Sequence, residues 1–305
     1  MSRQAGQPLD FPVCQIGSRE FRWGERTYVM GIVNATPDSF SGEGLLREGQ
    51  NPERMVEMAV AQALAFIEDG ADIIDVGGES TRPGAALVDE ETERERVVPV
   101  IRALRARTDV PISVDTYKAG VARAALEAGA DLVNDVWALQ MDPQMAAVVA
   151  EHGAAVVLMH NRSKPRDTAM QERLGGRYVG VHYADLIPDV IRELGERVAA
   201  AERAGIARDR IILDPGLGFG KTVEQNLQLL NHTDALHVLG LPILLGPSRK
   251  SFIGYTLDLP PDQRVEGTAA AVAVGVLRGA HIMRVHDVRV MARVCRMVDA
   301  ILRAG

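Results

Sequence analysis

The chain has 305 residues, of which 47% are hydrophobic, and a formal net charge of −7. A chain of this length and composition can bury one large core, which favours a single barrel over two separate domains. The mild acidity, with no Lys/Arg-rich run and no RNA-binding aromatic motif, argues against nucleic acid as a partner.

The N-terminal residues and the cysteines indicate the compartment. Residues 1–10 lack the basic and apolar regions of a signal peptide, and no segment reaches about 18 uninterrupted apolar residues. Cys14 and Cys295 form no CxxC motif or ligand cluster, which suits a reducing compartment and argues against structural zinc. We therefore expect a soluble, cytoplasmic protein with no membrane partner.

Eight short apolar runs are predicted to be strands, because parallel strands buried on both faces read as continuous Val, Ile and Leu. They cover residues 28–34, 72–77, 111–115, 132–136, 154–159, 211–214, 242–246 and 281–285. A helical pattern follows each run, and eight βα units in about 270 residues match a closed barrel. We expect an α/β fold, a (β/α)8 TIM barrel as a single domain over residues 26–305, after an N-terminal extension over residues 1–25. A doubly wound open sheet is the alternative.

Glycines mark the joints between these units. Gly70, Gly129 and Gly279 each precede a strand that has a polar residue five positions after the glycine. The similar segment from Gly153 has Leu158 at that position. Glycine supplies the left-handed residue that ends a helix, so these segments are predicted to be repeated αβ joints.

Three helix starts are also predicted. Residues 51–53 (Asn-Pro-Glu) and 89–91 (Asp-Glu-Glu) carry residues typical of a first helical turn. Residues 222–225 (Thr-Val-Glu-Gln) fit a capping box loosely.

Polar residues stand at the ends of most of these strands. In a β/α barrel the carboxyl ends of all strands face one mouth, so residues distant in sequence would line a single pocket. The residues expected there are Asn34, Asp75, Asp115, Asn134, Met159, Asp214, Lys250 and Arg284. Carboxylates and amides suit a flat heterocycle with donor edges, and the cations suit an anion.

Several of these residues also have a structural interpretation. Asp115 could cap a helix that begins three residues later, and Asn134 could be a loop or cap residue. Met159 would by default belong to the core, and Lys250 could be exposed in a loop. Asp214 has a weaker structural alternative, because the Pro-Gly that follows it does not start a helix.

Two segments have the composition of an anion site. Residues 77–84 combine flexible backbone amides, hydroxyl groups and one guanidinium in a single loop. Arg284 and His286 end the last strand, where barrels frequently bind phosphate, and their alternation predicts that both project the same way. Residues 216–222 superficially resemble a P-loop, but Pro215 replaces the first required glycine and we exclude a nucleotide site there.

Eight segments carry distinctive motifs in order along the chain: residues 30–41 (MGIVNATPDSFS), 77–84 (GGESTRPG), 113–116 (SVDT), 133–135 (VND), 158–160 (LMH), 214–221 (DPGLGFGK), 248–251 (SRKS) and 284–287 (RVHD). Taken together and in this order, these motifs resemble those of dihydropteroate synthase. The resemblance implies a transferase of folate biosynthesis. It would join 4-aminobenzoate to (7,8-dihydropterin-6-yl)methyl diphosphate, giving 7,8-dihydropteroate and diphosphate, with Mg2+ assisting.

The resemblance also implies which residues would bind the pterin. Asp115, Asn134 and Asp214 would hold the ring, with Met159 against its face and Lys250 donating to its ring atoms. A carboxylate such as Asp214 can accept two hydrogen bonds from the donor edge formed by the 2-amino and N3-H groups of a pterin.

The remaining roles concern the diphosphate and the aminobenzoate. Asn34, Arg284 and His286 would hold the diphosphate, and Asn34 would also ligate the metal. The residues implied for the aminobenzoate site and its lids are Thr81, Arg82, Pro83, Phe219 and Ser251. The residues implied to be catalytic are Asn34, Asp115, Lys250, Arg284 and His286. The family resemblance further implies a homodimer and a target for sulfonamides.

The chemistry expected is SN1-like. Departure of diphosphate would leave a CH2 cation conjugated to the pterin, which a nearby anion such as Asp115 would stabilise. The amine of 4-aminobenzoate would then attack, so no protein nucleophile is needed.

Three other functions remain open from the sequence. A methyltetrahydrofolate-dependent methyltransferase domain has a similar pterin pocket but no need for residues 248–250 beside Arg284 and His286. A phosphosugar barrel enzyme explains the anion site but not the carboxylates and amide at the strand ends. A non-catalytic pterin-binding paralogue is expected to have lost some polar strand ends, and none is lost here.

Overall fold

The computed structural model describes residue 11 and residues 13–36, 52–80, 85, 87–164, 168–171, 173–178 and 181–304. At its centre is an eight-stranded parallel sheet in the order β10-β7-β6-β5-β4-β3-β12-β11. The strands are β3 (Tyr28–Asn34), β4 (Ile73–Gly77), β5 (Ile112–Asp115), β6 (Leu132–Asp135), β7 (Ala155–Met159), β10 (Ile211–Asp214), β11 (Leu244–Leu245) and β12 (Ile282–Val285). All eight predicted strands are confirmed, the seventh in a shorter form than residues 242–246.

A parallel bridge between the two end strands of the sheet closes it. Leu213 in β10 pairs with Ile243, the residue before β11, and the Leu213 N–H donates to the carbonyl of Pro242 at 2.9 Å. The predicted (β/α)8 barrel is therefore confirmed and the open doubly wound sheet is excluded.

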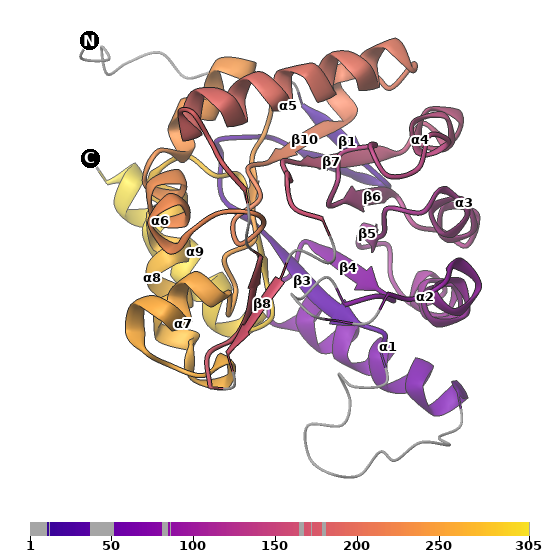
Figure 1. The fold of residues 1–305 in the computed structure, drawn as a ribbon. Coiled ribbons are helices and arrows are strands. Elements are labelled where there is room, and N and C mark those ends of the chain that lie inside the picture. Colours follow the sequence, from indigo (N-terminus) through magenta and orange to yellow (C-terminus); the bar gives the residue numbers. More distant parts are fainter. Residues whose placement is uncertain are drawn as a thin grey trace.

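Helices surround the strands (Figure 1). They are α1 (Pro52–Glu68), α2 (Glu90–Arg105), α3 (Ala119–Glu127), α4 (Met145–His152), α5 (Leu186–Arg203), α6 (Val223–Asn231), α7 (Ser251–Leu257), α8 (Val265–Leu277) and α9 (Val288–Arg303). Short 3-10 helices cover Arg208–Arg210, Thr233–Leu239 and Pro261–Gln263.

Local signals explain where these helices begin. Helix α1 begins at Pro52, and Asp89 caps α2 by accepting the Thr92 N–H at 2.9 Å. Thr222 and Gln225 form a complete capping box on α6, with hydrogen bonds of 2.9 and 3.2 Å. All three predicted starts are confirmed.

The predicted glycine joints are also confirmed. Gly70, Gly129, Gly153 and Gly279 have φ angles of 104°, 112°, 60° and 79°. Such angles are costly for residues with a Cβ, so glycine lets each helix end and the next strand begin within two or three residues.

The barrel interior changes character along its axis. Side chains two apart on a strand point to the same side, so one strand supplies residues to successive layers. The layer toward the amino ends of the strands is apolar and includes Met30, Ile73, Leu132, Val157, Ile212, Leu244 and Ile282. The next layer holds Asp75, Asn134, Met159, Asp214 and Arg284, each two residues after a member of the apolar layer. The strands thus present polar groups at the carboxyl mouth on an apolar base.

Two antiparallel hairpins lie outside the barrel sheet. Strands β1 (Cys14–Ile16) and β2 (Arg19–Phe21) form the first, and β8 (Thr168–Gln171) and β9 (Gly175–Tyr178) form the second. Cys14, Ile16 and Phe21 join the apolar layer of the barrel, so part of the segment treated as an extension packs against the core.

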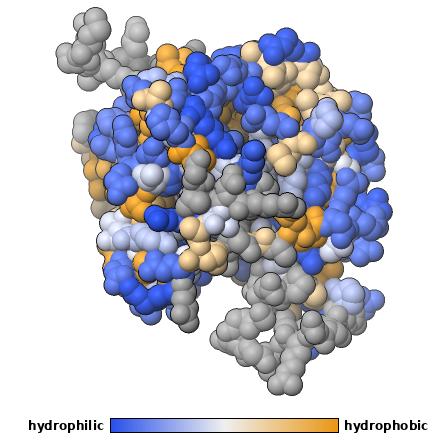
Figure 2. Space-filling model, in the orientation of Figure 1, coloured by the Kyte–Doolittle hydropathy of each residue, from blue (hydrophilic) through white to orange (hydrophobic). Residues whose placement is uncertain are grey.

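Figure 2 shows hydrophilic residues over much of the visible face, with hydrophobic residues in smaller groups. Among the described helices, none combines the length and hydropathy needed to cross a membrane. On α9, Val290 and Met297 are 41% and 62% exposed, whereas Val294 is half-buried against the core. Val294 therefore packs on the barrel, whereas much of Val290 and Met297 faces away from it.

Candidate active site

An ion-pair network occupies the mouth of the barrel. Arg284 in β12 donates from Nε to Asp75 Oδ2 and from Nη2 to Asp115 Oδ2, both at 2.6 Å. Asn134 in β6 donates from Nδ2 to the same Asp75 oxygen at 3.2 Å. Four strands thus place one guanidinium between two carboxylates, with an amide beside them.

Asp115 belongs to this network and does not cap α3. The residue that precedes α3 is Lys118, whose side chain makes no capping hydrogen bond, and the first N–H of the helix, that of Ala119, donates to Asp142 Oδ2 at 2.8 Å. Burial raises the pKa of Asp115 to about 7, while the charge of Arg284 opposes the rise and the carboxylate of Asp75 adds to it. The site therefore holds a carboxyl group whose charge responds to pH near neutrality.

Asp75 was expected at the mouth but was not assigned a role. It is fully buried, and its Oδ1 has no hydrogen-bond partner among the described residues. Its position five residues after Gly70 matches that of Asn134 and Arg284 after their own glycines, which was the signal available for it. Asp75 orients both of those residues.

A second pair of charges lies across the mouth. Asp214 ends β10 and its Oδ1 accepts the Gly216 N–H at 2.7 Å. Burial raises the pKa of Asp214, while the charge of Lys250 opposes the rise. Burial also lowers the pKa of Lys250 to about 8, while Asp214 opposes that shift. The two opposite charges therefore stabilise each other at the mouth.

Lys250 also contacts the loop after β10. Its Nζ donates to the carbonyl of Leu217 and lies 4.7 Å from the centroid of the Phe219 ring. Gly218, with φ of 84°, packs against the Lys250 side chain, and a Cβ at Gly218 would lie 2.9 Å from Lys250 Cδ. Lys250 is thus a half-buried residue of the mouth and not an exposed loop residue.

Met159 lies among aromatic side chains at the end of β7. It is buried in a small cluster with Val136, Trp137, Tyr178 and Phe219. The rings of Tyr178 and Phe219 stack with centroids 5.3 Å apart, which brings the second hairpin against the loop after β10. This apolar wall stands beside the charged groups, as a flat ring would require.

His286 and Ser251 lie near the ends of β11 and β12. Ser248 bonds to the backbone N–H of His286 at 3.1 Å and to its ring Nδ1 at 2.9 Å. Ser251 is the first residue of α7. Arg284 donates to Asp75 and Asp115, whereas the His286 ring contacts Ser248. The two side chains at the end of β12 therefore have different partners.

The strand register places Asn34 at the same mouth. Asn34 pairs with Gly77, and Gly77 pairs with Asp115 on the far side. The predicted residues Thr81, Arg82 and Pro83, and the predicted loop from residue 37 to 41, lie outside the described part of the chain.

Asn34 has the chemistry of a magnesium ligand. Its amide oxygen is a hard donor, and Mg2+ in proteins is commonly held by one or two protein oxygens together with substrate phosphates. Within the described residues, no three or more His, Cys, Asp or Glu side chains gather in a way that could hold a metal by themselves. The amide oxygen of Asn34 would fit Mg2+ as one ligand beside substrate phosphates and water.

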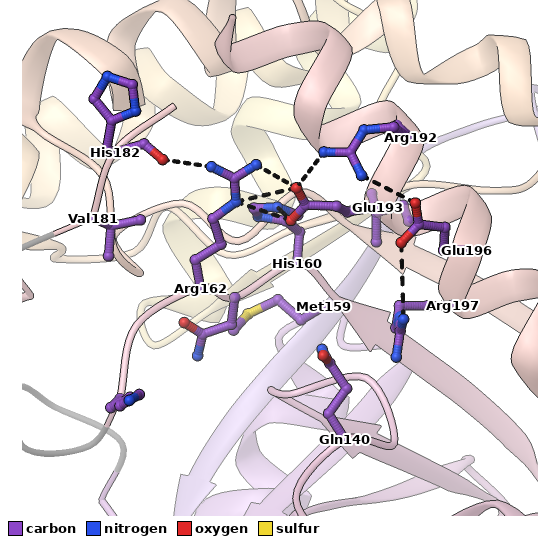
Figure 3. A pocket seen from close by; sticks show the side chains of 13 residues that line it. Gln140, Met159, His160, Arg162, Val181, His182, Arg192, Glu193, Glu196 and Arg197 are labelled. Atoms are coloured by element: carbon purple, nitrogen blue, oxygen red, sulfur yellow. Dashed lines mark hydrogen bonds and ion pairs between the residues drawn. The ribbon is translucent and has the colours of Figure 1, made fainter. Parts of the chain in front are cut away.

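A cavity of about 720 Å3 lies beside the mouth, between the segment after β7 and α5 (Figure 3). Met159 is the predicted site residue that also lines it. Its walls include His160, Arg162 and Glu193, which are joined by hydrogen bonds. Most predicted site residues lie outside this cavity, and the charged ones among them are at the mouth itself.

Comparison with known proteins identifies the family. The family described as "Pterin binding enzyme" matches residues 30–286 of this chain. The chain belongs to the pterin-binding enzyme family. Dihydropteroate synthase of Clostridium beijerinckii is 47% identical over 290 residues, which cover 95% of this chain and 99% of that protein.

Solved structures agree with this assignment. Dihydropteroate synthase of Xanthomonas albilineans with 4-aminobenzoic acid has a TM-score of 0.84 and 43% identity, covering 96% of this chain and 98% of the other. The Yersinia pestis enzyme in a sulfonamide drug complex has a TM-score of 0.85 and 41% identity, covering 96% and 100%. The predicted resemblance to dihydropteroate synthase, a transferase of folate biosynthesis, is confirmed.

Proposed function

We propose that this chain condenses (7,8-dihydropterin-6-yl)methyl diphosphate with 4-aminobenzoate, giving 7,8-dihydropteroate and diphosphate through a dihydropterin cation. The observation that carries the proposal is the set of buried polar groups at the barrel mouth, in which Arg284 lies between Asp75 and Asp115. The ligands named for the related structures support the same reaction.

The pterin ring would bind between Asp214 and Asn134, with Met159 on its face. Asp214 keeps Oδ2 for the donor edge of the ring while Oδ1 holds the Gly216 N–H. Lys250 would donate to a ring acceptor from the opposite side, because its ammonium lies beside the Leu217 carbonyl and the Phe219 ring at the mouth. The charge-assisted bond to Asp214 would supply most of the orientation.

The diphosphate would bind near the end of β12. Arg284 has five N–H donors, and the carboxylates take one from Nε and one from Nη2, so its remaining donors are left for phosphate oxygens. His286 and Asn34 would complete this side. Mg2+, held by Asn34 and the diphosphate, would neutralise the negative charge that grows on the leaving group.

Asp115 would stabilise the cation that follows diphosphate departure. Its carboxylate is buried beside Arg284, where a charge acts more strongly than in water. The amine of 4-aminobenzoate would attack from the side of Phe219 and Ser251. Residues 81–83 would contribute to that side by family resemblance. No protein nucleophile takes part, so positioning and electrostatics supply the catalysis.

A homodimer and a cytoplasmic location complete the proposal. The exposed side chains of Val290 and Met297, with Ile301 one turn beyond Met297 on α9, form an apolar stripe suited to a second copy. The buried, unpaired Cys14 and Cys295 are consistent with a reducing compartment.

The test is to supply both substrates with Mg2+ and to follow diphosphate release and 7,8-dihydropteroate formation. We expect formation of dihydropteroate to require both substrates. The proposal is overturned if the folded protein binds the pterin but forms no dihydropteroate. Slow diphosphate release without 4-aminobenzoate would support the cation route, whereas release that strictly requires 4-aminobenzoate would exclude that route and leave the condensation in place.

A further inference from the structure

A buried lysine with no assigned role lies behind the pterin-binding carboxylate. Lys221 precedes the cap of α6 and is 6% exposed. Its Nζ donates to the carbonyls of Gly216 and Phe219 at 2.9 and 3.0 Å. It also lies 3.2 Å from Nδ1 of His160, in the segment after β7. Lys221 thus joins two neighbouring loops of the mouth.

The histidine is held from its other side. His160 Nε2 lies 3.0 Å from Glu193 Oε2 on α5, and Glu193 also accepts from Arg162 (Figure 3). A carboxylate requires a donor, so Nε2 carries the proton and Nδ1 accepts from the Lys221 ammonium. Burial lowers the pKa of His160 to about 4, and the charge of Lys221 lowers it further in the same direction, which keeps the ring neutral.

The loop that Lys221 holds carries two predicted binding residues. It runs from Asp214 to Lys221 and includes Phe219. The Gly216 N–H that binds Asp214 belongs to the same peptide segment whose carbonyl binds Lys221. Gly216, with φ of 75°, packs so closely that a Cβ would come within 2.0 Å of the His160 carbonyl oxygen. Displacement of this segment would therefore move the Asp214 carboxylate that is proposed to bind the pterin.

Burying an ammonium group is costly, so its presence requires a compensating gain. Burial lowers the pKa of Lys221 to about 7, while the charge of Asp214 opposes that shift. Lys250 also holds this loop, through the Leu217 carbonyl. If Lys250 turns its donors to the pterin, as proposed above, Lys221 is the cation that continues to hold the loop.

We propose that Lys221 is a positioning residue for pterin recognition: its ammonium ties the loop bearing Asp214 and Phe219 to His160, and Glu193 orients the His160 ring. The inference rests on the proposed function, because it assigns the loop to the pterin. It adds Lys221, His160 and Glu193 to the residues on which substrate affinity depends, although none of them touches the substrate.

The first experiment compares Lys221→Met with the wild type in pterin binding and turnover. We expect the Kd for pterin to rise roughly tenfold, on the scale of one lost charged hydrogen bond, with kcat also reduced because Phe219 shifts. Thermal unfolding identifies the folded fraction. A folded variant with unchanged pterin Kd would overturn the inference, since a purely structural role lowers stability without changing the affinity of the folded molecules.

Two replacements of His160 separate the links on either side of its ring. His160→Asn places an amide oxygen near the position of Nδ1 and keeps an acceptor for Lys221, whereas His160→Gln places its amide near Nε2 and keeps only the link to Glu193. We expect His160→Asn to bind pterin within roughly threefold of wild type and His160→Gln to lose about as much affinity as Lys221→Met. Equal affinities in the two variants would contradict the tether and decide the matter even if Lys221→Met does not fold.

Helix α5 offers a matched control. Glu193→Ala removes the group that orients His160 and should raise the pterin Kd a few-fold. Glu196→Ala, on the next turn, removes an exposed partner of Arg192 and should leave the Kd unchanged. Equal effects of the two variants would also contradict the proposal. Failure of the wild type to form dihydropteroate would instead overturn the proposed function, which makes the two failures distinguishable.

Discussion

Individual side chains at the mouth combine opposite charges with burial. Asp115, Asp214, Lys250 and Arg284 were expected there from their places after predicted strands, and all four meet there. Asp75 was expected at the mouth without a role, because strand position does not reveal that Arg284 and Asn134 both donate to it. Partner choice depends on side-chain rotamers across the barrel, which no local sequence pattern encodes.

Asp214→Asn tests whether the Asp214 carboxylate binds the pterin. The variant keeps the shape and one acceptor for the Gly216 N–H but loses the charge that the donor edge of the pterin requires. We expect pterin binding to weaken by about 1.5 to 3 kcal/mol, the scale of a hydrogen bond to a charged group. Isothermal calorimetry on the folded variant measures this, and unchanged affinity would remove Asp214 from the pterin site.

The pH dependence of activity follows from two titratable groups of the mouth. Asp115 must be ionised to stabilise a cation, and its pKa of about 7 means that activity rises as pH approaches 7 from below. Lys250 must be protonated to donate, and its pKa of about 8 means that activity falls above pH 8. The lowered pKa of Lys221, about 7, adds to the fall.

The measurement is kcat/KM for the pterin diphosphate across this range. Residual activity of Asp115→Asn should be nearly flat on the acid side and should keep the alkaline fall. If the variant retains the wild-type rise on the acid side, that rise belongs to another group, such as the substrate itself.

Between elements, one buried ion cluster joins three segments near the mouth. Lys118, before α3, donates from Nζ to Glu79, after β4, and to Glu93 in α2, which is 1% exposed. Burial alone would lower the pKa of Lys118, but the hydrogen bonds to Glu79 and Glu93 outweigh it and raise that pKa to about 12.

Helix starts and glycine joints were predictable because they depend on neighbours in sequence, whereas the Lys118 cluster joins residues 39 and 25 positions apart.

Lys118→Met is expected to destabilise the protein by about 3 kcal/mol, because it leaves two buried carboxylates without a cation. Urea unfolding measures the loss. Adding Glu79→Gln and Glu93→Gln to the same chain should restore much of the stability, since the uncompensated charges are then gone. A triple variant no more stable than Lys118→Met would show that packing of the Lys118 stem, and not its charge, matters.

For the molecule as a whole, an apolar stripe on α9 is exposed to solvent. Val290, Met297 and Ile301 are exposed in the single chain, which suits contact with a second copy. Met297→Asp is expected to shift the protein from dimer to monomer in analytical ultracentrifugation, because a charge in the centre of an apolar interface is costly. Met141→Asp, at an exposed site four residues before α4, should leave the mass unchanged, because α4 lies on the other side of the barrel from α9 (Figure 1). A wild type that sediments as a monomer would contradict the proposed homodimer.

The sequence by itself determined the eight strands, the helix starts that were predicted and the polar strand ends, because these depend on hydrophobic periodicity and on residues close in sequence. Only the tertiary structure decided that the sheet closes through Leu213 and Ile243, because closure depends on strand tilt and stagger accumulated around the whole barrel. It also decided that Arg284 lies between Asp75 and Asp115, which are 209 and 169 residues away, and that Lys221 meets His160. Such partners are set by three-dimensional packing and by the cost of leaving a buried charge alone, and neither is written in a local pattern.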